Sequence, residues 1–155
     1  MVLRLTKQFS FEMAHALPLY EGKCHNIHGH SYKLFVTVEG TAGLQDPTAK
    51  IEALDTGAPL GMVMDFGQIK RLVEEHVVGP FDHALVLPRG GRGKEEPTDS
   101  LGGYAAKLIF VDFQPTTENL LLHFASLLQG RLPKGTRLYS LKLYETETSC
   151  AELVF

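Results

Sequence analysis

The chain has 155 residues, of which 44% are hydrophobic and 21% are charged, and we expect residues 1–155 to fold as a single soluble domain. Its formal net charge of −3 gives no indication of a nucleic-acid partner or of binding to an anionic membrane surface. No apolar run approaches the roughly 20 residues that would span a bilayer, and the N-terminus has no signal-peptide pattern, so we expect a cytoplasmic protein.

The first forty residues predict two strands. Apolar side chains alternate with polar ones over 5–14 and again over 30–40, which is the period of a half-buried strand. The intervening residues, 16–29, contain Pro18 and Gly22 and are expected to form a loop. Two neighbouring strands joined by a loop of this kind favour antiparallel pairing.

A helix is predicted after a long connection over 41–61. Asp65 is a candidate N-cap, and the apolar residues that follow it recur with a helical period. Gly79 and Pro80 are the residue types that end helices, so we expect the helix to stop there. A short apolar run to Leu87 comes next.

The second half of the chain predicts a loop, a second helix and further strands. The loop over 88–103 is rich in glycine and charge, and a brief apolar strand follows over 107–113. Thr116 is the expected N-cap of a helix that ends near Gly130. The last two segments with strand character are 137–146 and 151–155. The order is β-β-α-α-β-β in outline, which indicates an α+β fold with an antiparallel sheet covered on one face.

Histidines are concentrated near the start of the second predicted strand. His28 and His30 have i, i+2 spacing, which places both imidazoles on one face of a strand. His15 continues the apolar face of the first predicted strand. If the two strands pair, the three imidazoles can converge on one point, and three imidazoles with an open fourth position are typical of catalytic zinc. A lone histidine, by contrast, is usually an exposed or hydrogen-bonded residue, which is how we interpret His76 in the predicted helix.

Cys24 lies beside these histidines and leaves alternatives open. As a fourth ligand it would make the zinc site structural rather than catalytic. As a thiolate, favoured by the nearby Lys23 or by the metal, it could act as a base or nucleophile. It could also be a small loop residue without a chemical role.

Two further positions could carry chemistry. Asp82 and His83 are adjacent, and a carboxylate that orients an imidazole is a common proton-transfer unit, although a loop ion pair explains them equally well. Glu145 extends the apolar face of the strand over 137–146. It is therefore either an exposed strand end or a partly buried carboxylate whose partner carries paired N–H donors.

Six stretches of the chain carry a resemblance to a known family. They are Phe9 to His15, Cys24 to Tyr32, Gly61 to Phe66, Asp82 with His83, Pro115 to Leu120 and Tyr144 to Thr146. Together, and in this order, they resemble the 6-pyruvoyl-tetrahydropterin synthase and 6-carboxy-tetrahydropterin synthase family. The connection 41–61 and the loop 88–114 look longer than in compact members of that family.

The resemblance implies a tunnelling fold, in which a four-stranded antiparallel sheet carries two helices on one face. It also implies a homo-oligomer, a hexamer built as a dimer of trimers, with active sites at subunit interfaces. The site residues that it implies are zinc ligands His15, His28 and His30; catalytic residues Cys24, Asp82 and His83; and pterin-binding residues Glu145, Thr116, Thr117 and Glu118.

The implied substrate is a small molecule, 7,8-dihydroneopterin triphosphate. The spacing from Cys24 to His28 resembles the shorter form found in the bacterial 6-carboxy-tetrahydropterin synthases of queuosine and 7-deazaguanine biosynthesis. On that resemblance the product would be 6-carboxy-5,6,7,8-tetrahydropterin, with release of acetaldehyde and triphosphate. The alternatives are a 6-pyruvoyl-tetrahydropterin synthase and a non-catalytic, zinc-stabilised pterin-binding protein. Lys23, His25 and the arginines within 89–92 are candidates for binding the triphosphate.

Overall fold

A computed structural model describes residues 2–41, 61–90, 101 and 103–155. Most of the expected connection over 41–61 and most of the expected loop over 88–103 lie outside the described residues. The described strands are β1 (Leu3–His15), β2 (His28–Gly40), β3 (Ala84–Pro88), β4 (Leu108–Val111), β5 (Thr136–Tyr144) and β6 (Cys150–Val154). The helical segments are η1 (Lys23–His25), α1 (Phe66–Val73), η2 (Glu74–Val78), α2 (Gly79–Phe81) and α3 (Thr117–Leu128).

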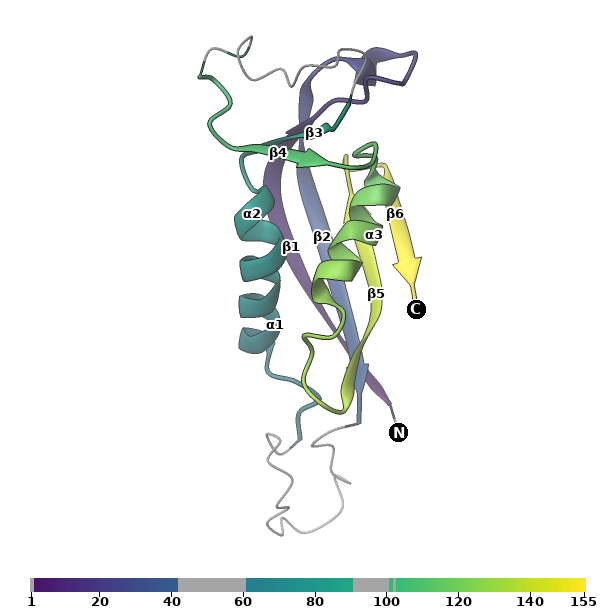
Figure 1. Ribbon diagram of the computed structural model, residues 1–155. Helices are drawn as coiled ribbons and strands as arrows, with labels where there is room; N and C mark the ends of the chain where they lie inside the picture. The colour runs from purple at the N-terminus through teal and green to yellow at the C-terminus, as the bar shows by residue number, and fades with distance from the viewer. Residues whose placement is uncertain (1, 42–60, 91–100, 102) are drawn as a thin grey trace, which may run out of the picture.

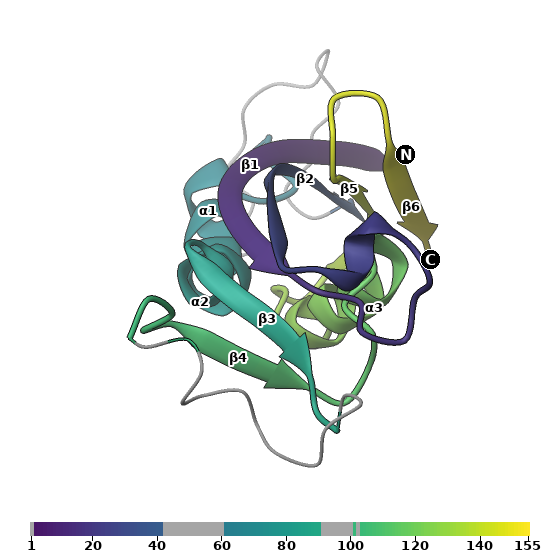
Figure 2. The same cartoon turned by 90° about the horizontal axis from the view of Figure 1, so that it is seen from above.

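The strands form one curled sheet, and both main helical segments lie on the same face of it (Figures 1 and 2). The strand order is β4-β3-β1-β2-β5-β6. The β1–β2, β2–β5 and β5–β6 pairs are antiparallel, whereas the β1–β3 and β3–β4 pairs are parallel. The α+β class and the two helices on one face are therefore confirmed.

The prediction of a four-stranded antiparallel sheet is wrong, because the sheet has six strands and is mixed. The short apolar run that ends at Leu87 is part of β3, a strand that adds to the edge of β1 in parallel. Residues Ala84 to Leu87 are all buried, so the strand has no polar alternation by which it could be recognised. The helical segment from α1 to α2 carries the chain to the end of the sheet at which β1 finishes, where β3 runs beside Met13 to His15 in the same direction.

The helix that begins after Asp65 ends at Phe81, so the stop predicted at Gly79 and Pro80 is confirmed to within one residue. The Asp65 side chain accepts a hydrogen bond from the Gly67 N–H at 2.8 Å, which confirms it as the N-cap. The π-helical turn η2 follows, in which the Gly79 N–H donates to the Glu74 carbonyl. A Cβ at Gly79 would lie 2.6 Å from that carbonyl oxygen, so only glycine fits. Pro80 follows directly in the short helix α2, which ends at Phe81.

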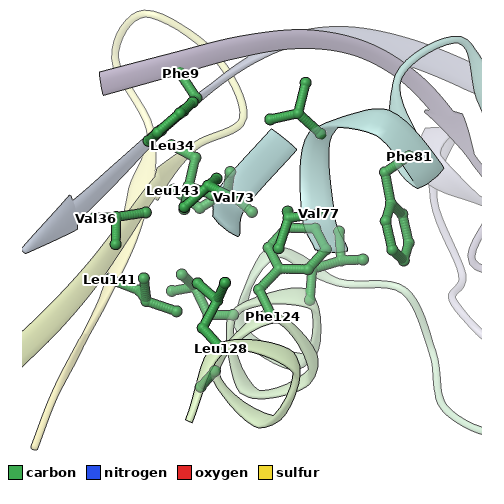
Figure 3. Packing of buried hydrophobic residues seen from close by; sticks show 14 of the residues in the cluster. Phe9, Leu34, Val36, Val73, Val77, Phe81, Phe124, Leu128, Leu141 and Leu143 are labelled. Carbon is green, nitrogen blue, oxygen red and sulfur yellow. The ribbon is translucent and has the colours of Figure 1, made fainter. Parts of the chain in front are cut away.

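The core lies between the sheet and the helices. Figure 3 shows apolar side chains of the strands pointing toward those of the helical segments. The labelled ones are Phe9, Leu34, Val36, Val73, Val77, Phe81, Phe124, Leu128, Leu141 and Leu143. A smaller cluster of Ala16, Leu85 and Leu87 lies apart from this core. In the described part of the chain, no helix is long and apolar enough to cross a membrane.

Thr116 caps α3, as predicted, because its hydroxyl oxygen accepts a hydrogen bond from the Asn119 N–H at 3.3 Å. We expect Thr116→Ala to lower the free energy of unfolding by about 1 kcal/mol, since the Asn119 N–H loses its acceptor. Urea denaturation followed by circular dichroism measures this change. Thr116→Ser keeps the hydroxyl and should restore most of the loss; equal stability of Thr116→Ala and the wild type would contradict the capping role.

Candidate metal centre and catalytic cleft

The antiparallel pairing of β1 with β2 brings three histidines together. His15 lies directly opposite His28, and Met13 lies opposite His30, so all three imidazoles project from one face. The ring centroids are 4.6 Å apart for His15 and His28, 5.3 Å for His15 and His30, and 4.9 Å for His28 and His30. One nitrogen from each ring lies within 4.8 Å of the other two. The structure therefore confirms the prediction that the three imidazoles converge on one point.

Two backbone carbonyls set the orientation of these rings. Nδ1–H of His15 donates to the Pro115 carbonyl at 2.7 Å, and Nδ1–H of His28 donates to the Asn26 carbonyl at 2.8 Å. A carbonyl oxygen can only accept, so each of these rings is left with a lone pair on Nε2. Among the described residues, Nε2 of His28 and Nε2 of His30 are buried without a hydrogen-bond partner. Orphaned imidazole nitrogens that converge in this way have the chemistry of a metal-ligand set.

Burial keeps the imidazoles in the form that binds metals. His15 is 1% exposed, and burial, followed by the neighbouring His28, lowers its pKa below the usual value. Burial likewise lowers the pKa of His30. The hydrogen bond from His15 to Pro115 and the charge of Glu145 oppose these shifts without reversing them. Both rings are therefore neutral near pH 7, and neutral imidazole is the metal ligand.

Glu145 directly follows the end of β5 and lies close to the histidines. Its Oε1 lies 3.5 Å from Nε2 of His15 and 3.7 Å from Nε2 of His30. The side chain is 28% exposed, so it is neither a frayed strand end nor fully removed from solvent. Of the two interpretations left open by the sequence, the structure supports the partly buried carboxylate.

Tyr32 is a member of this cluster that sequence analysis missed. Its hydroxyl is buried and lies 3.5 Å from Nε2 of His15. Burial and then the Glu145 carboxylate raise the pKa of Tyr32 above its usual range, with a smaller contribution from Cys24. The signal available in the sequence was the position of Tyr32 two residues after His30, which places it on the same face as the histidines.

Cys24 and the residues that begin α3 are other residues predicted to belong to this site. Cys24 is half-buried in the short helical turn η1, and its carbonyl accepts a hydrogen bond from the Leu17 N–H at 2.8 Å. It is not part of the cluster of possible metal ligands found among the described residues. Thr116, Thr117 and Glu118 directly follow Pro115, whose carbonyl holds His15. Of these three, Thr117 is buried and Glu118 is exposed.

Asp82 and His83 form the pair that the sequence suggested. Nδ1 of His83 lies 2.9 Å from Oδ2 of Asp82, in the turn between α2 and β3. The Glu12 N–H donates to Asp82 Oδ1 and, with the neighbouring His83 and Lys107, keeps the pKa of Asp82 below its usual value. The pair lines a cleft of about 920 Å³ whose lining also includes His30. The lining also includes Glu12 and Ser31, whose side chains alternate with those of the histidines along β1 and β2, so the cleft lies mainly on the opposite face of these strands.

The candidate triphosphate-binding residues are dispersed. Lys23 and His25 are exposed in η1, close in sequence to the histidine cluster. Arg89 is paired with Asp112, with 3.4 Å between its Nε and the carboxylate. Arg92 lies outside the described residues.

A family model of 6-pyruvoyl tetrahydropterin synthase matches residues 4–154. The chain belongs to this family. A 6-carboxy-5,6,7,8-tetrahydropterin synthase of Haemophilus influenzae is 32% identical over 153 residues, which cover 97% of this chain and 98% of that protein. A 6-pyruvoyl tetrahydrobiopterin synthase of Pongo abelii is 35% identical over 130 residues, which cover 83% of this chain and 68% of that protein.

Solved structures show the same fold. A 6-pyruvoyl tetrahydropterin synthase of Caenorhabditis elegans superimposes with a TM-score of 0.63 at 22% identity and covers 100% of this chain and 96% of that one. An uncharacterised protein of Wolinella succinogenes superimposes with a TM-score of 0.68 at 20% identity and covers 99% of this chain and 98% of that one. The family and its named relatives support a pterin synthase of the lyase type.

Proposed function

We propose that this protein is a zinc-dependent lyase that converts 7,8-dihydroneopterin triphosphate and one molecule of water to 6-carboxy-5,6,7,8-tetrahydropterin, with release of acetaldehyde and triphosphate. The observation that carries the proposal is the convergence of three imidazoles in a chain whose family is that of the tetrahydropterin synthases. His15, His28 and His30 would hold the zinc ion. When bound there, zinc supplies Lewis acidity that makes the hydroxyl groups of a bound substrate more acidic.

Two side chains of this protein, those of Cys24 and His83, would carry out the proton transfers. Cys24 would act as a base, because a thiolate next to the metal centre can accept a proton from the substrate side chain. His83 would exchange a second proton through the cleft, with Asp82 holding its Nδ1–H and leaving Nε2 free. Two separate proton-transfer groups suit a reaction in which the substrate is rearranged by internal oxidation and reduction without a nicotinamide.

Glu145 would bind the pterin ring. A carboxylate that is partly buried beside the metal ligands can accept two hydrogen bonds from the guanidine-like edge of a pterin. Thr116, Thr117 and Glu118 would line the same pocket, since the residue before them contacts His15.

The 6-carboxy product is favoured over the 6-pyruvoyl product by two observations. The Haemophilus influenzae relative named for the 6-carboxy product is matched over 98% of its length, whereas the Pongo abelii relative named for the 6-pyruvoyl product is matched over 68%. The short spacing between Cys24 and His28 points the same way. The identity to the Pongo abelii protein, 35%, keeps the 6-pyruvoyl product as the second candidate.

The reaction is tested by incubating the zinc-loaded protein with 7,8-dihydroneopterin triphosphate and identifying the pterin by mass spectrometry. We expect 6-carboxytetrahydropterin together with acetaldehyde, which a coupled alcohol dehydrogenase assay detects. A 6-pyruvoyl product without acetaldehyde would establish the second candidate. Binding of the pterin without turnover would establish a non-catalytic pterin-binding protein.

We expect Glu145→Gln to weaken pterin binding about 100-fold, because a charged acceptor of hydrogen bonds becomes a neutral one that also presents donors. Isothermal titration with neopterin measures the affinity, and atomic absorption measures zinc, which should be retained. Glu147→Gln is the matched control, since Glu147 is exposed in the same turn. Unchanged affinity for neopterin in Glu145→Gln would refute the anchor role.

Self-association is part of the proposal. We infer a homo-oligomer, a hexamer formed by two trimers, whose active sites lie at subunit interfaces. Sedimentation velocity of the zinc-loaded protein should therefore show a particle larger than a dimer, and dilution that dissociates it should abolish turnover. A fully active monomer would contradict an interfacial site.

A further inference from the structure

The turn that carries the Asp82–His83 pair has an unusual backbone. His83 has a φ of 58°, in the left-handed region that L side chains other than glycine, asparagine and aspartate rarely adopt. Asp82 before it is extended, and β3 begins immediately after it at Ala84. A histidine in this conformation stays there only if the surrounding structure holds it.

Strand β1 supplies part of that support. The His83 N–H donates to the Glu12 carbonyl at 2.6 Å, and the Glu12 N–H donates to Asp82 Oδ1 at 2.9 Å. These two bonds tie both members of the pair to one residue of the sheet. The remaining carboxylate oxygen, Oδ2 of Asp82, lies 2.9 Å from Nδ1 of His83.

Lys107, which follows the pair in the sequence, supplies further support to this turn. Its Nζ donates to the Gly79 carbonyl at 2.7 Å and to the Asp82 carbonyl at 2.5 Å. Its own backbone is fixed, because the Lys107 carbonyl accepts from the Leu85 N–H at 2.9 Å, just before β4 begins. The ammonium group therefore joins the end of the helix to the turn that follows it, at carbonyls that the helix itself leaves without a partner.

We propose that Lys107 is a positioning residue for His83: it clamps the turn from Gly79 to His83, so that Asp82 keeps the His83 imidazole in the tautomer with Nδ1 protonated and Nε2 free in the cleft. This inference rests on the proposed function for the role of His83 in proton transfer. Two of the three donors of the Lys107 ammonium group are directed to backbone carbonyls of the turn, which is why the role assigned to this residue is one of positioning. It acts on the imidazole through the backbone of Asp82.

Steady-state kinetics of the zinc-loaded full chain with 7,8-dihydroneopterin triphosphate tests the clamp. We expect Lys107→Met to lower kcat about tenfold, because a proton-transfer group that is displaced loses part of its contribution. KM should stay within about twofold of the wild type, because a positioning residue affects the proton transfer and not substrate binding, and zinc content should be unchanged, because the hydrogen bonds of the Lys107 ammonium group go to the turn and not to the three histidines. Lys107→Arg should recover most of kcat, because a guanidinium can donate to both carbonyls.

Lys134→Met serves as the matched control, since Lys134 is exposed in the turn before β5, and its kcat should equal that of the wild type. A kcat for Lys107→Met that equals that of Lys134→Met would overturn the inference. So would a parallel loss of kcat in Lys107→Met and Lys107→Arg, since the arginine variant preserves the donors.

The tautomer of His83 gives a second readout that does not require turnover. Nitrogen-15 NMR of the imidazoles should show the Nδ1–H form of His83 in the wild type and a mixture of tautomers in Lys107→Met. A His83→Asn variant identifies the signal. If the wild type failed to convert the substrate while Lys107→Met still changed the tautomer, the proposed function would fail and the positioning role would stand; an unchanged tautomer would remove the positioning role.

Discussion

His28→Ala is expected to abolish stoichiometric zinc binding and, with it, the lyase activity. His28 contributes one of three ligand nitrogens, and its Nε2 is buried without a partner among the described residues. Loss of a residue that only orients a ligand typically lowers metal affinity 10- to 100-fold, so loss of a ligand itself should lower the affinity by more than about 100-fold. Zinc content after exhaustive dialysis, measured by atomic absorption, gives the result directly.

His28 is a better choice than His15 for this experiment. His15 is 1% exposed, so its replacement by alanine would leave a cavity and confuse loss of metal with loss of stability. His28 is half-buried at the first position of β2. His76→Ala is the control, because His76 lies in η2 on the helical side of the fold and should retain both zinc and activity.

A second measurement separates the metal from the fold. Zinc that binds only the folded chain raises its melting temperature, so the wild type and His76→Ala should be stabilised by zinc, whereas His28→Ala should not. Full zinc content in dialysed His28→Ala would rule out the three-histidine site.

Cys24→Ala is expected to lower kcat by about 10²- to 10⁴-fold, which is the usual contribution of a proton-transfer group, while zinc and the fold are retained. The geometry behind this expectation is that the described cluster of possible metal ligands contains the three histidines without Cys24. The variant is assayed for turnover, zinc content and melting temperature on the same preparation.

Cys150→Ala is the matched control, since the only other cysteine is exposed at the start of β6 and should not affect turnover. If Cys24→Ala lost its zinc together with its activity, Cys24 would be a fourth ligand and the site structural. Full activity with zinc retained would instead leave Cys24 as a loop residue without a chemical role.

Much of the site could be predicted because its parts obey local rules. Alternation along two neighbouring strands predicted that His15, His28 and His30 share one face if the strands pair, and neighbouring strands joined by a loop favoured antiparallel pairing. The helix caps at Asp65 and Thr116 could also be predicted, because each depends only on a side chain and on an N–H two or three residues away. The candidate roles of the site residues came from the six short stretches that resemble the tetrahydropterin synthases, because the periodicity of the sequence does not indicate a residue's role.

Other features depend on contacts between residues far apart in the chain. Ala84 to Leu87 form a parallel strand only because β1 is there to pair with, and a fully buried run has no alternation that distinguishes it from other apolar segments. The π-helical turn before Gly79, in which the Gly79 N–H donates to the Glu74 carbonyl, is likewise indicated by no local pattern in the sequence.

The sequence by itself therefore determined the α+β class, the two helices, the shared face of the three histidines and the family. Only the tertiary structure decided the mixed six-stranded sheet, the carbonyl of Pro115 that orients His15 from 100 residues away, and the approach of Glu145 and Tyr32 to the same imidazoles. It also decided that Lys107 reaches the turn of Asp82 and His83. The physical reason is that periodicity and capping act over a few residues, whereas the contacts that orient these side chains are made between strands and helices that meet only when the chain has folded.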